Sequence, residues 1–440
     1  MPEKQLWGGE TTKAVENFPI SSERVPVSVV RWLARLKGAA ALVNGELGLL
    51  DKRRASSIAK GAGEIAAGKH DAQFPIDVFQ TGSGTSTNTN ANEVIAALAG
   101  SSVHPNDHVN MGQSSNDVFP SAVHLAALDV AQNELLPALR QLERSFAKKS
   151  KSFQNVVKSG RTHLMDAVPV TLGQEFGGYA AQIALGQERV RSALVHVGQI
   201  PLGGTATGTG LNTHAKFAEK VRARLKKESG LKQIAAPLDR FEAQGSRDAL
   251  VELSGALKVV AVSLSKIAGD LALMGSGPRA GIGEIRLPEL QKGSSIMPGK
   301  VNPVIPEVVL QVSAQVIGND TAITVGGMQG QFELNVRIPL LARNLLQSLH
   351  LLASTSRVFA EKCVDGIEVN RAGCEASAGA TLAAATALNS AIGYDKGTTI
   401  VKRATDSGRP LREIALEEGV DAKLYDATID LRKIARGNQV

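Results

Sequence analysis

Cysteine is nearly absent from this chain, and aromatic residues are scarce. Cys363 and Cys374 are the only cysteines among 440 residues. Two thiols exclude a disulfide framework, and they exclude a cysteine-ligated iron–sulfur cluster, which needs about four thiolates. So few cysteines are typical of a reducing compartment, and we expect a cytoplasmic protein. Aromatic residues make up only 4% of the sequence, so an aliphatic, helical core is expected, because small and unbranched side chains cost least in a helix.

Neither a signal peptide nor a membrane span is expected from the sequence. The opening Met-Pro-Glu-Lys-Gln-Leu-Trp has no apolar core of the kind that a signal peptide needs. The most apolar stretch, residues 256–274, carries Lys258, Lys266 and Asp270. It therefore predicts a buried helix rather than a membrane span, and no membrane partner is expected.

The charge of the chain is only mildly one-sided. The net charge is +7, and its basic runs, such as 148–151 and 222–227, are short and scattered. Such runs are typical of solvated helix faces, so we expect no nucleic-acid partner. A mild positive field suits a dianionic substrate without selecting one.

Aliphatic residues recurring every three or four positions indicate long helices. A chain of 440 residues predicts two or three domains. We expect a mixed part over 1–115, a long-helix bundle over 116–362 and a small helical part over 363–440. The expected helices are 29–48, 53–67, 121–151, 172–197, 248–274, 303–325 and 335–362. Helices this long favour a bundle whose apolar faces are covered by other subunits.

The first polar loop is Thr-Gly-Ser-Gly-Thr-Ser-Thr-Asn-Thr-Asn over residues 81–90. Its glycines allow backbone N–H groups to approach an anion, and Ser83 and Thr85 add hydroxyl donors. One interpretation is a carboxylate or phosphate cradle. The other is a capped helix start, because Ser, Thr and Asn are preferred N-caps.

The second polar loop runs from His104 to Asp117. Pro105 separates His104 from His108, which makes a shared helical face and a metal site unfavourable. Asn116 or Asp117 is expected to cap the following helix. A helix start with free hydroxyls suits an anion, so capping and anion binding are compatible here.

His163 stands in the irregular segment Gly-Arg-Thr-His-Leu-Met-Asp. A lone histidine is often structural, but polar, non-periodic neighbours such as Thr162 and Asp166 favour a functional role. Both readings stay open on these residues alone.

The most specific segment is Gly-Ser-Ser-Ile-Met-Pro-Gly-Lys-Val-Asn-Pro over residues 293–303. Asn302 as N-cap and Pro303 as first helical residue predict a helix start. A loop that carries Ser294 and Lys300 beside a helix N-terminus suits carbanion chemistry next to a carboxylate. Glu307, one turn into that helix, supplies a carboxylate able to orient a histidine.

These segments together resemble the fumarase/aspartase superfamily, and within it the class II fumarases. The match extends in order over nearly the whole chain. It comprises residues 14–19, 81–85, 104–107, 113–116, 160–163, 201–205, 208–212, 293–303, 318–320, 332–336 and 393–395. The segment 293–303 matches the superfamily signature Gly-Ser-Ser-x-Met-Pro-x-Lys-x-Asn-Pro completely.

The resemblance implies a mainly α, three-domain subunit whose long helices form a twenty-helix core in a homotetramer. It implies reversible hydration of fumarate to L-malate without metal or cofactor, in active sites shared by three subunits. Ser294 is then the base, with His163 and Glu307 as the acid system. The implied substrate-binding residues are Ser83, Thr85, Ser114, Ser115, Asn116, Thr162, Lys300 and Asn302. A second carboxylate site is implied at His104, Asn106 and Asp107, next to a stretch (96–103) that is shorter than in many relatives.

Two alternatives remain within this resemblance. An aspartate ammonia-lyase shares the superfamily, but Gly299 stands where aspartases usually carry Ala, and Phe332-Glu-Leu-Asn is similar to fumarases. A structural protein derived from the fold is the second alternative. It predicts a damaged site, whereas Ser294, Lys300 and His163 are all present.

Overall fold

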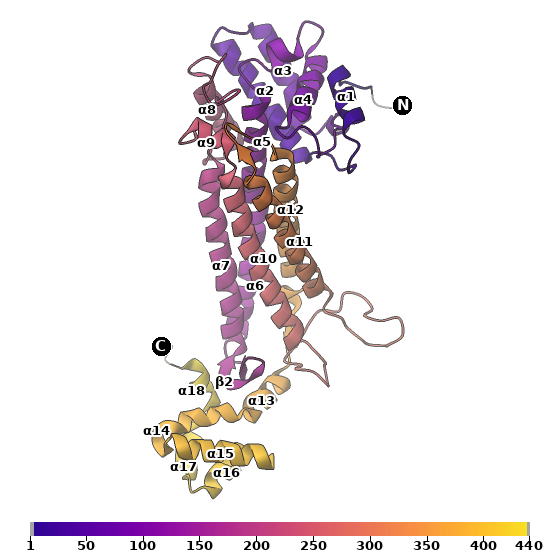
Figure 1. Cartoon of the computed structure of the whole chain (residues 1–440). Helices are drawn as coiled ribbons and strands as arrows, with labels where there is room; N and C mark the ends of the chain where they lie inside the picture. Colours follow the sequence, from indigo (N-terminus) through magenta and orange to yellow (C-terminus); the bar gives the residue numbers. More distant parts are fainter. Residues whose placement is uncertain (1–3, 438–440) are drawn as a thin grey trace. The chain divides into compact units, whose positions relative to one another are not determined.

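The computed structural model describes residues 4–437, and most of them are helical (Figure 1). Residues 1–3, part of the opening segment considered above for a signal peptide, lie outside the described part. The α-helices are α1 (Gly9–Asn17), α2 (Val27–Glu46), α3 (Lys52–Ala66), α4 (Thr85–Ala99), α5 (Ser115–Val130), α6 (Leu136–Ser152), α7 (Leu172–Val197), α8 (Phe217–Ser229), α9 (Arg240–Gly245), α10 (Asp248–Met274), α11 (Val304–Gly327), α12 (Ile338–Lys362), α13 (Arg371–Ala380), α14 (Asn389–Ile392), α15 (Tyr394–Ser407), α16 (Leu411–Glu417), α17 (Ala422–Thr428) and α18 (Leu431–Arg436).

Strands are short and form three antiparallel two-stranded pairs: β1 (Val157–Thr162) with β2 (Met165–Thr171), β3 (Ile285–Arg286) with β6 (Glu368–Val369), and β4 (Gly330–Gln331) with β5 (Leu334–Asn335). Short 3₁₀ turns are η1 (Asp71–Gln73), η4 (Val364–Gly366) and η5 (Leu382–Leu388), and π turns are η2 (Pro105–Val109) and η3 (Ala131–Leu135). The mainly α class expected from the sequence is confirmed.

The long helices follow the predicted periodicity closely. The predictions over 172–197 and 248–274 coincide with α7 and α10. Within α10, Leu257, Leu264 and Leu271 are fully buried, but Val262 and Leu273 are about half exposed. Between residues 4 and 437, no helix is long and apolar enough to cross a membrane.

The helix predicted over 121–151 begins earlier than expected and is interrupted. It starts as α5 at Ser115, passes through the π turn η3 and continues as α6. The expected cap at Asn116 or Asp117 is wrong. Ser114 is the N-cap, its Oγ accepting from the Asn116 N–H at 3.2 Å. Asp117 closes the capping box instead by accepting the Ser114 N–H at 2.9 Å.

The start of α11 differs by one residue from the prediction. The helix begins at Val304, so Pro303 precedes it. Asn302 therefore lies one position too early to be its N-cap. Its side-chain N–H₂ donates to the Gly293 carbonyl at 2.8 Å and closes the preceding loop. Glu307 lies in the first turn of α11, as expected.

The chain divides into two compact units built from discontinuous stretches. One comprises residues 4–138, 186–262 and 312–354, and the other comprises 139–185, 263–311 and 355–437. The predicted division into three consecutive parts stays a prediction.

The first unit contains α2, whose neighbours are α3, α4, α5 and α8 (Figure 1). Its centre, residues 32–41, is buried except for Arg35, with Leu33, Leu36 and Ala40 fully enclosed. The N-termini of α4 and α5 follow the first and second polar loops, so this unit carries both loops.

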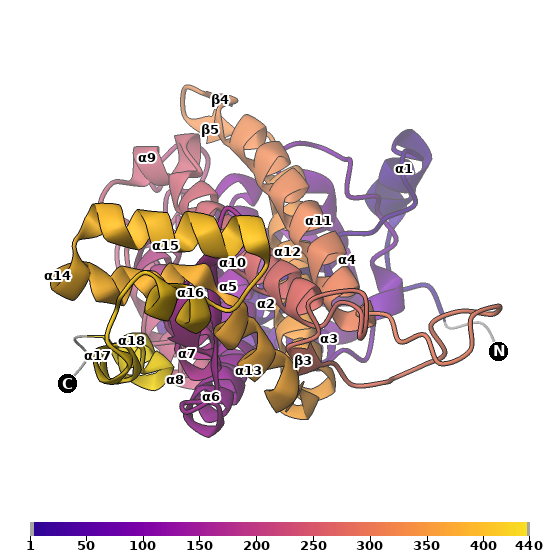
Figure 2. The same ribbon diagram turned by 90° about the horizontal axis from the view of Figure 1, so that it is seen from below.

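The second unit contains the β1–β2 hairpin, the 293–303 loop and the short C-terminal helices. Phe146, Phe176, Tyr179 and Phe359 form an aromatic cluster, with ring centroids 5.7–6.0 Å apart. The C-terminal helices α14–α17 pack around their own buried aliphatic residues (Figure 2). The hairpin was not expected, since strand signals in the sequence are sparse.

Candidate active site

His163 lies at the tip of the β1–β2 hairpin. Thr162 pairs with Met165, so His163 and Leu164 form a two-residue turn. Both have positive φ, 57° and 62°, as a type I′ turn requires, although such turns prefer Asn and Gly. Leu164 is 73% exposed, so burial does not compensate for the strain. Strained non-glycine residues cluster at functional sites, and this geometry favours a functional His163 over a structural one.

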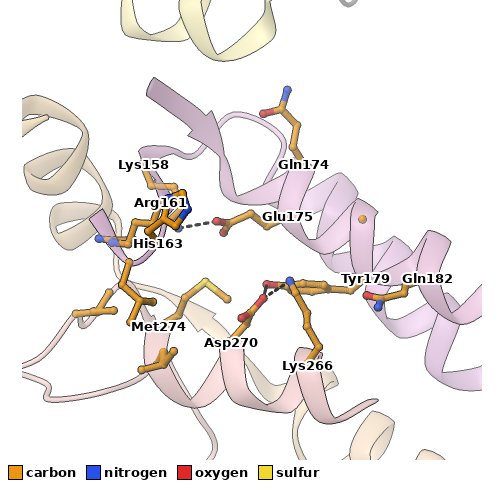
Figure 3. Close-up of a pocket in the computed structure, with 14 residues that line it drawn as sticks. Lys158, Arg161, His163, Gln174, Glu175, Tyr179, Gln182, Lys266, Asp270 and Met274 are labelled. Carbon is orange, nitrogen blue, oxygen red and sulfur yellow. Dashed lines mark hydrogen bonds and ion pairs between the residues drawn. The ribbon is translucent and has the colours of Figure 1, made fainter. Parts of the chain in front are cut away.

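A buried ion network holds the hairpin below its tip, and Figure 3 shows three of its members, Lys158, Arg161 and Glu175. Glu284 is fully buried and pairs with Lys158 at 3.0 Å and with Arg161 at 2.9 Å. Lys158, itself 2% exposed, also pairs with Glu175 at 2.8 Å. The Ser377 hydroxyl donates to Glu284 at 2.9 Å. Burial raises the pKa of the Glu175 carboxyl, and the charge of Lys158 acts against this rise.

His163 lines one side of a cavity of about 640 Å³, together with Lys158, Arg161 and Glu175 of this network. On its other side, the Tyr179 hydroxyl donates to Asp270 at 2.8 Å, and Lys266 pairs with the same carboxylate (Figure 3). This network was not predicted, and the residues next to Lys158 and Glu175 in the sequence give no sign of it.

The 293–303 loop is closed by its own backbone. The Gly293 N–H donates to the Lys300 carbonyl at 3.1 Å, and the Asn302 amide donates back to Gly293. A Cβ on Gly293 would lie 2.2 Å from the Lys300 oxygen, and Gly299 has φ +75°. Both glycines are therefore required by the turn, and the closed loop holds Lys300 and Asn302 beside the start of α11.

Ser294 lies inside this loop with its hydroxyl oxygen already surrounded by donors. Its Oγ accepts from the Ile296 N–H at 3.2 Å and from the Met297 N–H at 3.1 Å. Both contacts are donated to Oγ, so they would stabilise negative charge on this oxygen.

The predicted partnership of His163 with Glu307 is not formed within one chain. Among residues 4–437, neither the His163 ring nor the Glu307 carboxylate has a hydrogen-bond partner, and both side chains are exposed. Thr162 is also exposed at the end of β1. The pair stays a prediction.

The two polar loops of the first unit meet through a chain of hydroxyls. Ser83 Oγ lies 2.7 Å from Thr85 Oγ1, which lies 2.9 Å from Ser115 Oγ. Thr85 is the first residue of α4 and Ser115 the first of α5. Two helix N-termini with convergent hydroxyls suit an anion. Ser114 adds the capping hydroxyl described above, while the Asn116 amide donates to the Ala206 carbonyl at 2.9 Å.

The second candidate carboxylate site forms the π turn η2. His104 Nδ1 accepts from the Asp107 N–H at 3.2 Å, and His108 Nδ1 accepts from the His104 N–H at 2.8 Å. His104 and Asp107 are exposed, and Asn106 is part of the same turn. In the part of the chain that the structure describes, no group of three or more His, Cys, Asp or Glu side chains is placed to hold a metal ion.

Comparison with known proteins identifies the family. A family model described as "Lyase" matches residues 1–318, and one described as "Fumarase C C-terminus" matches residues 385–436. The class II fumarate hydratase of Corynebacterium glutamicum is 57% identical over 98% of this chain and 92% of its own length. That of Mycobacterium tuberculosis is 52% identical over 100% and 94%. The chain belongs to the class II fumarate hydratases.

Solved structures agree with this membership. The class II fumarase from Schistosoma mansoni superimposes with a TM-score of 0.96 at 36% identity, covering 99% of this chain and 96% of that one. A Brucella melitensis fumarate lyase:delta crystallin, crystallised with cobalt, superimposes with a TM-score of 0.94 at 44% identity, covering 99% and 97%. The fold of this fumarate hydratase therefore follows that of the family over its whole length.

Proposed function

We propose that this class II fumarate hydratase interconverts fumarate and L-malate in a homotetramer, using active sites that are each shared by three subunits. The hydration itself follows from family membership over the full chain. The mechanism rests mainly on one observation, the two backbone N–H groups that surround Ser294 Oγ.

Dehydration of malate requires removal of a weakly acidic proton from the carbon next to a carboxylate, followed by loss of hydroxide from the neighbouring carbon. We assign the first step to Ser294, whose ionised form is favoured by its donors. The resulting carbanion delocalises its charge onto the adjacent carboxylate. Lys300 and the second N–H of the Asn302 amide bind that carboxylate, because the first N–H is used by Gly293.

The leaving hydroxide needs a proton donor on the other carbon. We assign it to His163, which the hairpin turn presents to solvent, acting through a water. Since His163 and Glu307 do not meet within one chain, we propose that they come from different subunits. The Ser83, Thr85 and Ser115 hydroxyls, with Ser114, Asn116 and Thr162, bind the remaining substrate oxygens.

Exposed apolar side chains on the long helices support the tetramer. They include Leu185 and Val195 on α7, Val259, Val262 and Leu273 on α10, and Val308, Leu310, Ile317 and Val325 on α11, each 38–54% exposed. Such stripes are costly in water and are covered when helices of several subunits form a common core. Cys363 and Cys374 are free and buried. Free thiols are compatible with a reducing compartment, and we propose that the enzyme is cytoplasmic.

Absorbance of the fumarate double bond tests the function directly. Purified protein is added to L-malate, with L-aspartate in a parallel cuvette, and a rise with malate alone is expected. A rise with aspartate alone would identify an aspartate ammonia-lyase. Absence of a rise with both, in folded protein, would support the structural-protein alternative.

Chelation is expected to leave the activity intact. The assigned acid–base groups are a serine, a histidine and a glutamate, and the described residues contain no metal-binding cluster. Turnover of L-malate after dialysis against EDTA should equal that of a mock-dialysed sample. Loss of activity that added Mg²⁺, Mn²⁺ or Fe²⁺ restores would contradict the metal-free mechanism.

A further inference from the structure

Lys37 is a fully buried cation without a directly bonded carboxylate. It lies in α2, with 0% of the residue exposed. Its Nζ donates to Asn110 Oδ1 at 3.1 Å and to Gln113 Oε1 at 3.2 Å, both neutral amide oxygens. Burial lowers the pKa of Lys37 to about 7, while the charge of Asp117 opposes this shift. A buried ammonium costs several kcal/mol in desolvation, which neutral amides repay only in part.

The negative charge near Lys37 is that of Asp117, which accepts hydrogen bonds from other groups. Asp117 is fully buried and accepts three backbone N–H groups, from Ser114 at 2.9 Å, Gly203 at 2.9 Å and Thr205 at 3.0 Å. Burial raises the pKa of its carboxyl, and these donors act against the rise. Asp117 thus anchors the loop through its hydrogen bonds, and it acts on Lys37 only through space, without a direct ion pair.

The contacts of Lys37 place it behind the anion-binding cradle of the first unit. Gln113 immediately precedes Ser114, the N-cap of α5. Asn110 also accepts from the Asn88 amide at 3.2 Å, and Asn88 lies in the first turn of α4. Lys37 is therefore connected through Asn110 to the start of α4 and through Gln113 to the start of α5, where the Thr85 and Ser115 hydroxyls lie.

We propose that Lys37 is a positioning residue whose buried charge, acting through Asn110 and Gln113, strengthens the hold of the α4 and α5 N-termini on a substrate carboxylate. The inference rests on the proposed function, since it assigns the cradle to a dicarboxylate. It concerns binding rather than bond making, because Lys37 does not reach the substrate itself.

The principal test is Lys37→Met, measured at pH 6, below the pKa of about 7, so that wild-type Lys37 carries its charge. The variant preserves volume and removes that charge. A unit charge acting across about 10 Å at an effective dielectric constant near 20 changes affinity by roughly tenfold. We expect KM for L-malate to rise by about tenfold or more, with kcat changing by less than about threefold. The inhibition constant of succinate, a dicarboxylate with neither a double bond nor a hydroxyl, should rise by the same factor.

Thermal stability separates this role from a structural one. Replacing a buried charge with an apolar side chain of similar volume is often neutral or stabilising, so Tm of Lys37→Met should equal or exceed that of the wild type. Lys60→Met is the matched control, since it removes the same charge from the exposed face of the neighbouring helix α3. It should leave KM, the succinate constant and Tm unchanged.

A second variant keeps the proposal testable if Lys37→Met does not fold. Gln113→Glu places a carboxylate against the ammonium and offsets its field without removing it. It also removes the hydrogen bonds that Gln113 Nε2 donates to the Val109 and Met111 carbonyls, at 3.1 and 3.4 Å. It should weaken succinate binding by about tenfold as well. The proposal is overturned if either variant folds and binds succinate as tightly as the wild type does. It is also overturned if a variant has a lower Tm or kcat but an unchanged succinate affinity. Calorimetric titration measures the succinate affinity of each variant independently of turnover. The proposed function has a separate test, because it is overturned if the wild-type protein is inactive on malate and fumarate.

Discussion

Replacing Ser294 by alanine should lower kcat for L-malate by roughly 10²–10⁴-fold, the usual contribution of a general base. The two backbone N–H groups that now bind the Ser294 oxygen remain in place in the variant, but no oxygen is left to take the proton. The loop itself is closed by Gly293, Lys300 and Asn302 rather than by the Ser294 side chain. We therefore expect the fold, the oligomeric state and the succinate affinity to persist.

Ser295→Ala is the matched control for this experiment. Ser295 is the adjacent residue of the same loop and has an exposed side chain, so its loss should lower kcat by less than about tenfold. Steady-state kinetics on L-malate and succinate inhibition measure both variants. Near-normal turnover in Ser294→Ala, or equal losses in the two variants, would refute the assignment of Ser294 as the base.

Glu284→Ala should reduce the free energy of unfolding by about 3–5 kcal/mol, as expected when one partner of a buried ion network is removed. Glu284 is fully buried and neutralises Lys158, which is 2% exposed, and Arg161. Without it, Lys158 keeps only Glu175 as a partner. The residue also joins segments far apart in sequence, because Ser377 in α13 donates to it. Urea unfolding measures the change.

Two further variants define the origin of this effect. Glu289→Ala removes an exposed carboxylate five residues further along and should change stability by less than about 0.5 kcal/mol. The double variant Lys158→Met, Glu284→Leu should be more stable than Glu284→Ala, because it also removes the most deeply buried cation of the network. The two charges that it leaves without these partners, Arg161 and Glu175, are 21% and 26% exposed and are therefore partly solvated. If Glu284→Ala unfolds at the wild-type urea concentration, the network does not hold the hairpin.

Much of the helical architecture was predictable from local sequence. The limits of α7 and α10 coincide with the predicted ranges, since a long 3.6-residue periodicity ends visibly where loop residues begin. Capping was less predictable. Asn302 and Ser114 are both good N-caps by type, but only Ser114 caps the helix that follows it. The helix α11 begins at Val304, two residues after Asn302, and the Asn302 amide donates to the Gly293 carbonyl nine positions earlier.

The candidate site also has features that the sequence predicted and features that it did not. The motifs at 81–85, 113–116, 160–163 and 293–303 carry the resemblance to the class II fumarases, and the comparisons confirm that family. The type I′ turn at His163 was not predicted, because neither His163 nor Leu164 favours positive φ. The meeting of Ser83, Thr85 and Ser115 was not predicted either, since it joins residues thirty positions apart.

Residue order alone was enough to establish the helical class, the long helices and the loop motifs that identify the family, because each depends on neighbours within a few turns. The partners of the buried charges were decided by the tertiary structure. Glu284 meets Arg161 across 123 positions, and Lys37 meets Gln113 across 76. The energy of a charged side chain depends on what surrounds it once water is excluded, and only the folded chain determines those surroundings.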